Sequence, residues 1–345
     1  MAIIKAGYQF IEEPSVTKKI ERVARVCYKS EDKIQEGSDL KMVNALIRRE
    51  HTAMLEHASV ALIVDRCTYN YLNQIRETME TCCTDDIIVP ENCYLRFTYA
   101  ATMDSGMTSH RYIVSGNVRA WYRFLVYANS YDCGIPLATF NVLNHAVNRI
   151  FDRFNKNVGI SKGYQHFFDD SLNASASLIT DFSKLSTKER LIHEDVSVLF
   201  TVDRGVTHEL VRHRDASFAQ ESTRYCNYSL DKFCQEVNVI EPCFYEGRDD
   251  EYNAWVSAVE DAQMHYFDLL AAGSKPQEAR DVLSTSTKAD IVVTTNLREW
   301  MHILNLRACD STGPAHPQIK EVMIPVLKEM QKKYPFAFGK LIAAE

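Results

Sequence analysis

The sequence predicts an α+β protein in which several helices pack on a small mixed sheet. The chain has 345 residues, enough for one large domain or two ordinary ones with a real core. Apolar residues recur with helical spacing in several segments, whereas two short apolar runs are typical of strands. These runs are SVALIVD (59–65) and VSVLFTVD (196–203), and we expect both in the one sheet.

The predicted helices follow in chain order. The first half of the chain has helical spacing over 16–30 and 39–50. In the second half, Gly205 ends the 196–203 strand and VTHELVRHR continues with helical spacing. Gly273 closes a long amphipathic helix, and Ser274 and Gln277 are placed for a capping box at the start of the next. Four helices are therefore expected in this half. Two have predicted bounds, 255–273 and 296–309, and the other two start after residue 205 and near residue 274.

The stretch 66–195 separates the two strand-like runs, which resemble each other. Within it, Asn117-x-Arg119-x-Trp121 is a faint echo of Asn296-x-Arg298-x-Trp300. An echo of three residues is weak evidence for a repeat, and it favours chance.

Composition limits the possible partners. The net charge is −7, which argues against a broad nucleic-acid or membrane surface, so any anion recognition must be local. No apolar run approaches the roughly 20 residues of a membrane helix, and the N-terminus has no leader pattern. The ten cysteines are irregularly spaced without C-x-x-C, which favours reduced thiols and a cytoplasmic protein.

The segment RHRDASFAQESTRY (212–225) is the densest local cluster of cationic side chains. Guanidinium groups suit phosphates because they offer several donors in a fixed fork. Arg212 and Arg214 point in different directions at a helix end, which allows two ligands. Ser222 and Arg224 lie on one side of an extended segment and could clasp a phosphate. The alternative is that R-H-R is simply a solvated helix end.

Other kinds of site are disfavoured. His51, Glu56 and His57 would diverge before a strand, and His208-Glu209 with His213 is one residue too long for a zinc hydrolase, so we expect no metal. The sequence has no G-x-S-x-G, G-x-G-x-x-G or Walker A motif, and nothing marks an activated cysteine. The arginines therefore indicate a phosphorylated ligand bound without a glycine-rich loop.

Four segments, in order, resemble the motifs of flavin-dependent thymidylate synthases, the ThyX family. R-H-R with the serine eight residues on is the signature, and HTAMLEHASVALIV resembles the H-x-x-x-x-E-H segment. EARDVL and TNLREWMHILNLRACDSTGPAHPQIKEV resemble two later helices. The resemblance covers 1–64 and 196–345. It implies a discontinuous catalytic domain, 1–65 and 196–345, interrupted by an insertion of unknown role at 66–195.

The resemblance also implies an activity, the reductive methylation of dUMP to dTMP. Methylenetetrahydrofolate would give the carbon, and NADPH would supply reducing equivalents through FAD. A flavin rather than a protein thiolate then carries the difficult step, which accounts for the missing nucleophilic cysteine. Family members are homotetramers with shared active sites, so a homotetramer is expected here, with no nucleic-acid or membrane partner.

Site residues carry over by position. Arg307 and Ser222 are the expected catalytic residues. FAD would be bound by His51, Ala53, Arg212, His213, Arg214, Asn296, Arg298 and His302. dUMP would be bound by Glu209, Arg212, Gln220, Ser222, Arg224, Arg280 and Arg307.

Some positions depart from the family pattern. Ala53 replaces a common Ser or Thr, and Glu209 and Gln220 stand where others can carry Gln and Glu. Asp215 adds negative charge beside the R-H-R cluster. Two alternatives stay open: a related flavoenzyme with another pyrimidine nucleotide or a hydroxymethyl product, and a non-enzymatic nucleotide- or RNA-binding protein.

Overall fold

The computed structural model describes residues 1–82, 95–104, 107–130, 135–151 and 176–344. The rest of the predicted insertion lies outside the described residues. The chain divides into two compact units. Unit 1 comprises 1–12, 22–33 and 196–345, and unit 2 comprises 13–21 and 34–195. Residues 34–65 therefore group with 66–195 by contacts, while the division at residue 66 stays a prediction about the family core.

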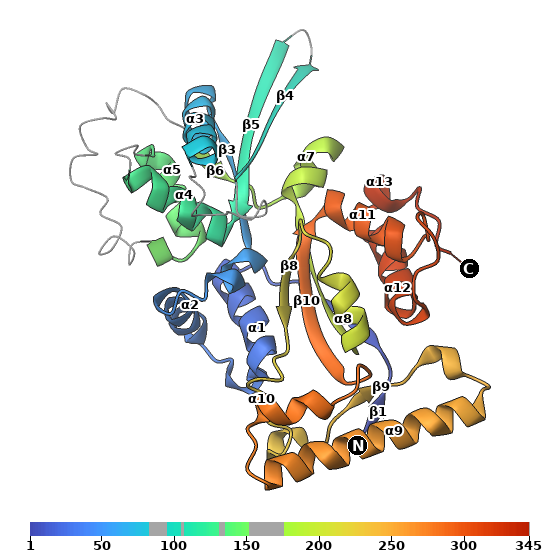
Figure 1. Ribbon diagram of the computed structural model, residues 1–345. Coiled ribbons are helices and arrows are strands. Elements are labelled where there is room, and N and C mark those ends of the chain that lie inside the picture. Colours follow the sequence, from blue (N-terminus) through green and yellow to red (C-terminus); the bar gives the residue numbers. More distant parts are fainter. Residues whose placement is uncertain (83–94, 105–106, 131–134, 152–175, 345) are drawn as a thin grey trace. The chain divides into compact units, whose positions relative to one another are not determined.

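Unit 1 is built on a four-stranded sheet with strand order β2-β7-β10-β8, next to a short parallel pair of β1 and β9 (Figure 1). Strand β10 lies inside this sheet, and its apolar residues Ile291, Val292 and Val293 are fully buried. The strands are β1 (Ile3–Ile4), β2 (Gly7–Phe10), β7 (Asp195–Asp203), β8 (Ser217–Gln220), β9 (Val239–Ile240) and β10 (Lys288–Asn296).

The helices of unit 1 begin at caps that the sequence supplies. The Asp203 carboxylate accepts a hydrogen bond from the Val206 N–H at 2.8 Å, and the Asn296 amide oxygen accepts one from the Glu299 N–H at 2.8 Å. These caps start α8 and α11. The helices are α8 (Arg204–Leu210), α9 (Asp249–Ala271), α10 (Pro276–Ala279), α11 (Leu297–Arg307), α12 (Pro317–Lys333) and α13 (Pro335–Phe338), with single 3-10 turns at Asp231–Phe233, Cys243–Tyr245 and Arg280–Val282.

The predicted capping box at Ser274 and Gln277 is wrong by one residue. The Glu278 carboxylate accepts a hydrogen bond from the Lys275 N–H at 2.8 Å, and Pro276 is the first helical residue. Proline is common at this first position because an N–H group there has no acceptor within the helix, so no hydrogen bond is lost. The predicted end of α9 at Gly273 is confirmed, since this glycine has φ of +100° after the helix.

Unit 2 has a four-stranded sheet of its own, with strand order β4-β5-β3-β6 and antiparallel pairing throughout. Its elements are α2 (Ser38–Arg48), β3 (Ser59–Val64), α3 (Arg66–Cys82), β4 (Arg96–Asp104), β5 (Met107–Asn117), α4 (Val118–Ser130), α5 (Leu137–Ala146), β6 (Ala176–Leu178) and α7 (Thr187–His193), with 3-10 turns at Thr52–His57 (η2) and Phe182–Lys184. Helix α1 (Val16–Tyr28) runs across the division between the units, and a 3-10 turn at Glu31–Lys33 follows it in unit 1.

The α+β class and the helices predicted over 16–30, 39–50, 255–273 and 296–309 are confirmed. The prediction that the 59–65 and 196–203 strands share one sheet is wrong. Strand β3 pairs with β5 and β6, both from the 66–195 stretch, so its hydrogen-bonding edges are satisfied without β7.

Two further predictions concern the described part of the chain. None of its helices has the length and apolar character needed to cross a membrane. The cysteines whose side chains are described are free thiols, namely Cys27, Cys67, Cys226, Cys234, Cys243 and Cys309.

Candidate functional site

Strand pairing in unit 1 brings two distant motifs together. Strand β8 runs antiparallel to β10, with Ser217 opposite Thr294, so the R-H-R turn before β8 lies beside the start of α11. The Thr295 hydroxyl fixes this approach by donating a hydrogen bond to the Asp215 carbonyl at 2.7 Å. Side chains of residues 209–215 and 296–307 therefore belong to one site.

A hydrogen-bonded chain of three predicted site residues lies at the centre of this site. Arg307 Nη1 donates to the Glu209 carboxylate at 2.9 Å, and Arg307 Nε donates to His213 Nε2 at 3.3 Å. The Glu209 and Arg307 side chains are 29% and 22% exposed, so the ion pair stays open to a ligand. Glu209 thus neutralises and orients the Arg307 guanidinium, which gives a role to the carboxylate that departs from the family pattern at this position.

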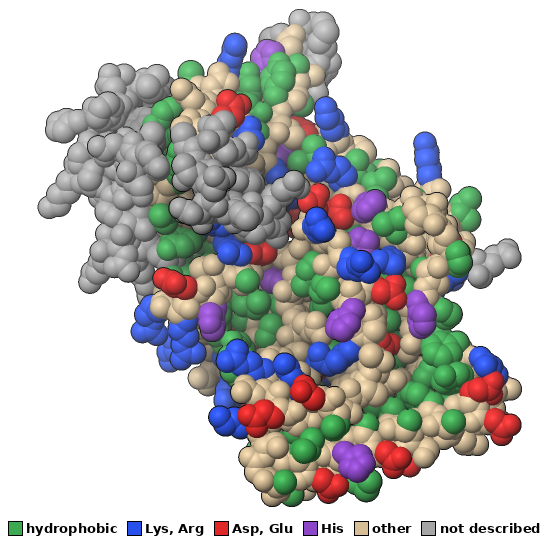
Figure 2. Space-filling view, viewed as in Figure 1, with side chains coloured by type: hydrophobic (Ala, Val, Ile, Leu, Met, Phe, Trp, Pro, Cys, Tyr) green, Lys and Arg blue, Asp and Glu red, His purple; other side chains and the backbone are tan. Residues whose placement is uncertain are grey.

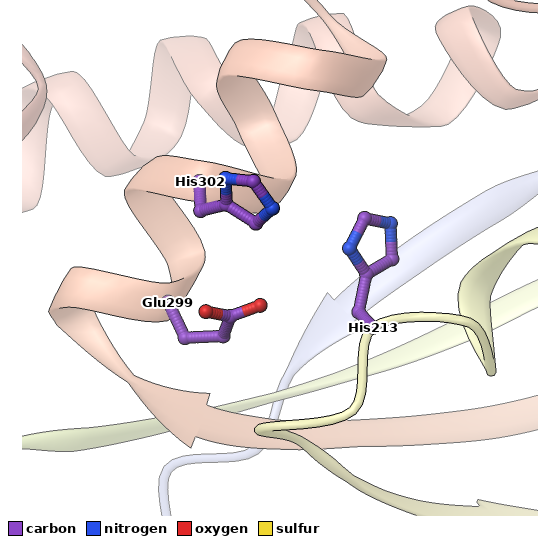
Figure 3. A group of neighbouring side chains, drawn as sticks. All are labelled: His213, Glu299 and His302. Atoms are coloured by element: carbon purple, nitrogen blue, oxygen red, sulfur yellow. The ribbon is translucent and has the colours of Figure 1, made fainter.

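His213, Glu299 and His302 point toward one another from the turn and from α11 (Figure 3). The potential ligand atoms of these three lie within 4.8 Å of one another, and the two imidazole centroids are 6.1 Å apart. Burial, with help from Arg307 and His302, lowers the pKa of His213 to about 4, while burial raises the pKa of Glu299.

This group has the donor types of a metal site, but the Arg307 guanidinium donates to His213 Nε2 and would repel a cation there. We assign no metal to it. The sequence reasoning missed Glu299, although its position three residues before His302 puts both on one helix face.

The predicted phosphate residues gather at the other end of β8. The Ser222 N–H donates to the Cys27 carbonyl at 3.1 Å, which fixes the segment after the strand. The Arg224 N–H donates to the Ser222 hydroxyl at 3.3 Å, and Arg280 Nη1 donates to the Thr223 hydroxyl at 3.3 Å. Arg224 and Arg280 are exposed, so two guanidinium groups flank this segment and face solvent.

A buried ion cluster lies next to the Ser222–Arg224 segment, because one of its members, Glu221, directly precedes Ser222. Lys288 Nζ donates to Glu221 at 2.8 Å and to Asp290 at 2.7 Å, and Lys29 pairs with the same two carboxylates. The Tyr228 hydroxyl donates to Glu221 at 3.2 Å. Burial opposes ionisation of Asp290, but the two lysines outweigh it and lower the pKa of its carboxyl.

The sequence reasoning missed this ion cluster as well, although Lys288 and Asp290 are charged residues at the start of a strand whose centre, 291–293, is apolar. Beside the cluster lies a cavity of about 650 Å³, lined by Lys29, Glu221, Tyr228 and Lys288 among others. None of the predicted ligand-binding residues lines this cavity.

The remaining predicted residues are placed as follows. Arg212, Arg214 and Arg298 are exposed, and the Asn296 amide caps α11. Gln220 Nε2 donates to the Thr207 hydroxyl at 3.2 Å, which turns it toward α8. On the face in Figure 2, Lys, Arg and His side chains are interspersed with acidic ones.

His51 and Ala53 are exposed at the start of η2 and belong to unit 2. Their place beside the unit 1 residues stays a prediction.

The sequence profile of the thymidylate synthase complementing protein family matches residues 156–336, more than half of the chain. The chain belongs to this family. The resemblance to ThyX proteins is thereby confirmed, since relatives in the family are named flavin-dependent thymidylate synthases. The ThyX match begins within the predicted insertion and leaves residues 1–155 outside it.

Among these relatives, the Pyrococcus abyssi protein is 34% identical over 145 residues, which cover 41% of this chain and 57% of that one. The Corynebacterium efficiens protein is 33% identical over 147 residues, covering 40% and 58%. A Mycobacterium sp. protein is 31% identical over 181 residues, covering 47% and 66%. The chain thus spans little more than half the length of the first two ThyX relatives.

Among solved structures, a UMP/dUMP methylase from Streptomyces cacaoi bound with 5-Br dUMP is 23% identical to this ThyX chain. The match covers 43% of this chain and 70% of that one, with a TM-score of 0.37. That score is too low to support a structural argument.

Proposed function

We propose that this ThyX protein is a flavin-dependent thymidylate synthase, which methylates dUMP reductively to dTMP. The observation that carries the proposal is the hydrogen-bonded chain of Glu209, Arg307 and His213 in a member of this family. It holds a guanidinium, neutralised by a carboxylate and half-open to solvent, at the meeting point of the R-H-R turn and α11.

The residues of this site fit FAD. Arg212, Arg214 and Arg298 are exposed cations around the His213–His302 pair, and they would bind the pyrophosphate and the flavin ring edge. His213 is neutral at pH 7, so it can accept and donate hydrogen bonds without adding charge. When bound, FAD would supply the hydride chemistry for which the chain offers no group of its own.

The Ser222–Arg224 segment would bind the phosphate of dUMP. Two exposed guanidinium groups and a hydroxyl match a phosphate dianion, and the buried ion cluster holds the segment in place. Each hydrogen bond to a charged group contributes about 1.5–3 kcal/mol, which would add to the affinity for dUMP.

Arg307 would serve the reaction itself. Its two hydrogen bonds fix the guanidinium before the substrate arrives, so no reorganisation is needed when negative charge develops on the pyrimidine oxygens. Glu209 keeps this cation from repelling the cationic groups around it. Ser222 donates its hydroxyl to the substrate and thereby completes the site.

Incubation of the purified protein with dUMP, methylenetetrahydrofolate, NADPH and FAD tests the proposal. We expect flavin absorbance that remains with the protein after desalting, and dTMP as the product. A hydroxymethyl nucleotide, or turnover only with another pyrimidine nucleotide, would favour the related flavoenzyme. A colourless protein whose nucleotide affinity ignores the base and falls steeply with salt would favour the non-enzymatic binder.

The finer expectations belong to this proposal. NADPH and methylenetetrahydrofolate are the proposed co-substrates, and the reduced cysteines favour the cytoplasm. The active form would be an oligomer with shared sites, in which His51 and Ala53 supply contacts to FAD.

A further inference from the structure

Three strands of each sheet correspond both in spatial order and in chain order, whereas the fourth strand comes first along the chain in unit 1 (β2) and last in unit 2 (β6). In unit 1 the order is β8-β10-β7-β2, and in unit 2 it is β4-β5-β3-β6. Each sheet has two inner strands. The inner strand that comes first along the chain leads directly into a helix, from β7 into α8 in unit 1 and from β3 into α3 in unit 2. The other inner strand, β10 or β5, leads into α11 or α4. Strands β7, β8 and β10 therefore correspond to β3, β4 and β5.

The first strand-to-helix junction is built alike in both units. The junction from β7 to α8 reads Val-Asp-Arg at 202–204, and the junction from β3 to α3 reads Val-Asp-Arg at 64–66. Asp203 caps α8 by accepting from the N–H three residues on at 2.8 Å, and Asp65 caps α3 by accepting from the Thr68 N–H at 2.8 Å. An aspartate thus caps the helix that follows the corresponding strand in both units.

The second junction repeats as well. Asn296 and Asn117 each accept a hydrogen bond at 2.8 Å from the N–H three residues on. Four residues after each asparagine, a fully buried tryptophan donates its indole N–H to a carbonyl of the neighbouring strand. Trp300 donates to Val196 at 3.0 Å, and Trp121 donates to Val60 at 3.1 Å.

The echo of Asn-x-Arg-x-Trp therefore has a structural basis. Its asparagine caps a helix and its tryptophan ties that helix to the sheet in both units, which argues against chance. The intervening arginine differs, because Arg119 pairs with the buried Glu56 whereas Arg298 is exposed.

Apart from Asn296 and Arg298, whose counterparts are Asn117 and Arg119, the site residues compared between the units do not repeat. Counted from the aspartate caps, Tyr71 stands at the position of Glu209, whereas α3 continues as a helix where α8 ends and the R-H-R turn begins. Counted from the asparagine caps, Arg123 stands at the position of His302 and Ala128 at that of Arg307. Ala128 is buried and apolar, so unit 2 has a core residue at the helix position where unit 1 has Arg307.

We infer that unit 2 is a second copy of the unit 1 fold that lacks the counterparts of Glu209 and Arg307. Each chain then binds one dUMP and one FAD at the unit 1 site, and His51 and Ala53 are the unit 2 residues that would add contacts to FAD. The identity of the two ligands rests on the proposed function. On this inference, residues 66–195 are no insertion into a single domain. They are most of a second domain, which begins before residue 59.

Binding stoichiometry tests the loss of the site. The full chain, loaded with FAD and desalted, is assayed for flavin per chain by absorbance and then titrated with dUMP by calorimetry. We expect one FAD and one dUMP per chain, and two of either would overturn the inference. His302→Ala should weaken FAD binding at least about tenfold, whereas the matched unit 2 variant Arg123→Ala should leave affinity and stoichiometry unchanged.

A crystal structure of the full chain tests the duplication without any ligand. We expect β3, β5 and α4 to superpose on β7, β10 and α11 in the same order, with both indole hydrogen bonds present. A different strand order in unit 2 would overturn the inference. If neither FAD nor dUMP binds, the proposed function is wrong. The superposition still tests the duplication in that case, because it needs no ligand.

Discussion

Removal of one cation from the buried ion cluster of unit 1 should destabilise the protein strongly. Lys288 contacts Glu221 and Asp290 at 2.8 and 2.7 Å, and the Lys288, Glu221 and Asp290 side chains are only 14%, 1% and 10% exposed. In Lys288→Met the thioether replaces the aliphatic stem, while two carboxylates face Lys29 alone. The loss of one member of a buried ion pair costs about 3–5 kcal/mol.

We expect a value near the lower end, about 3 kcal/mol, because Lys29 still reaches both carboxylates. Urea unfolding followed by tryptophan fluorescence measures the change. The double variant Lys288→Met/Asp290→Asn leaves one cation and one carboxylate, so it should recover part of the loss. Lys5→Met removes a cation whose side chain is 82% exposed, and it should unfold as the parent does.

A destabilisation below about 1 kcal/mol in Lys288→Met would refute this reasoning, since a cost that small is typical of a solvated pair. A double variant less stable than the single one would refute the argument from charge balance. In that case Asp290 would stabilise the sheet through its hydrogen bond from the Thr201 hydroxyl, at 2.6 Å, rather than through its charge.

Three further predictions concern the site. Arg307→Ala should retain FAD, by absorbance, but lower turnover about 10²–10³-fold, because a preorganised cation is lost; near-normal turnover would contradict its role. Ser222→Ala and Arg224→Ala should each weaken dUMP binding about 10–100-fold in calorimetry, whereas Arg248→Ala at the N-cap of α9 should not. His213 binds its proton less readily when folded, so stability should fall as pH drops from about 6.5 to about 4, and His213→Gln should flatten that slope.

The sequence predicts what depends on near neighbours. The end of α9 at Gly273 and the gathering of Ser222 with Arg224 follow from residues a few positions apart. The pairing of Arg307 with Glu209 could not be predicted, because 98 residues separate them and only the β8–β10 pairing brings them together. The same holds for Lys29 and Asp290, which lie 261 residues apart.

The sheet assignment failed for a related reason. The apolar run of β3 is typical of a buried strand, but such a run does not specify its partners. Those partners come from β5 and β6, in a stretch where the sequence showed no motif of the family. The resemblance rests on ligand-binding side chains, and a domain that has lost them keeps only caps and a buried tryptophan.

If one chain contains two copies of one fold, the number of folds in an oligomer is twice the number of its chains. If four such folds make up the active form, two chains supply them, with a mass of about 79 kDa from two chains of 39.5 kDa each. Only half of those folds would carry ligands. Apart from His51 and Ala53, substitutions in the other half would then change assembly and solubility and would leave the chemistry at each working site intact.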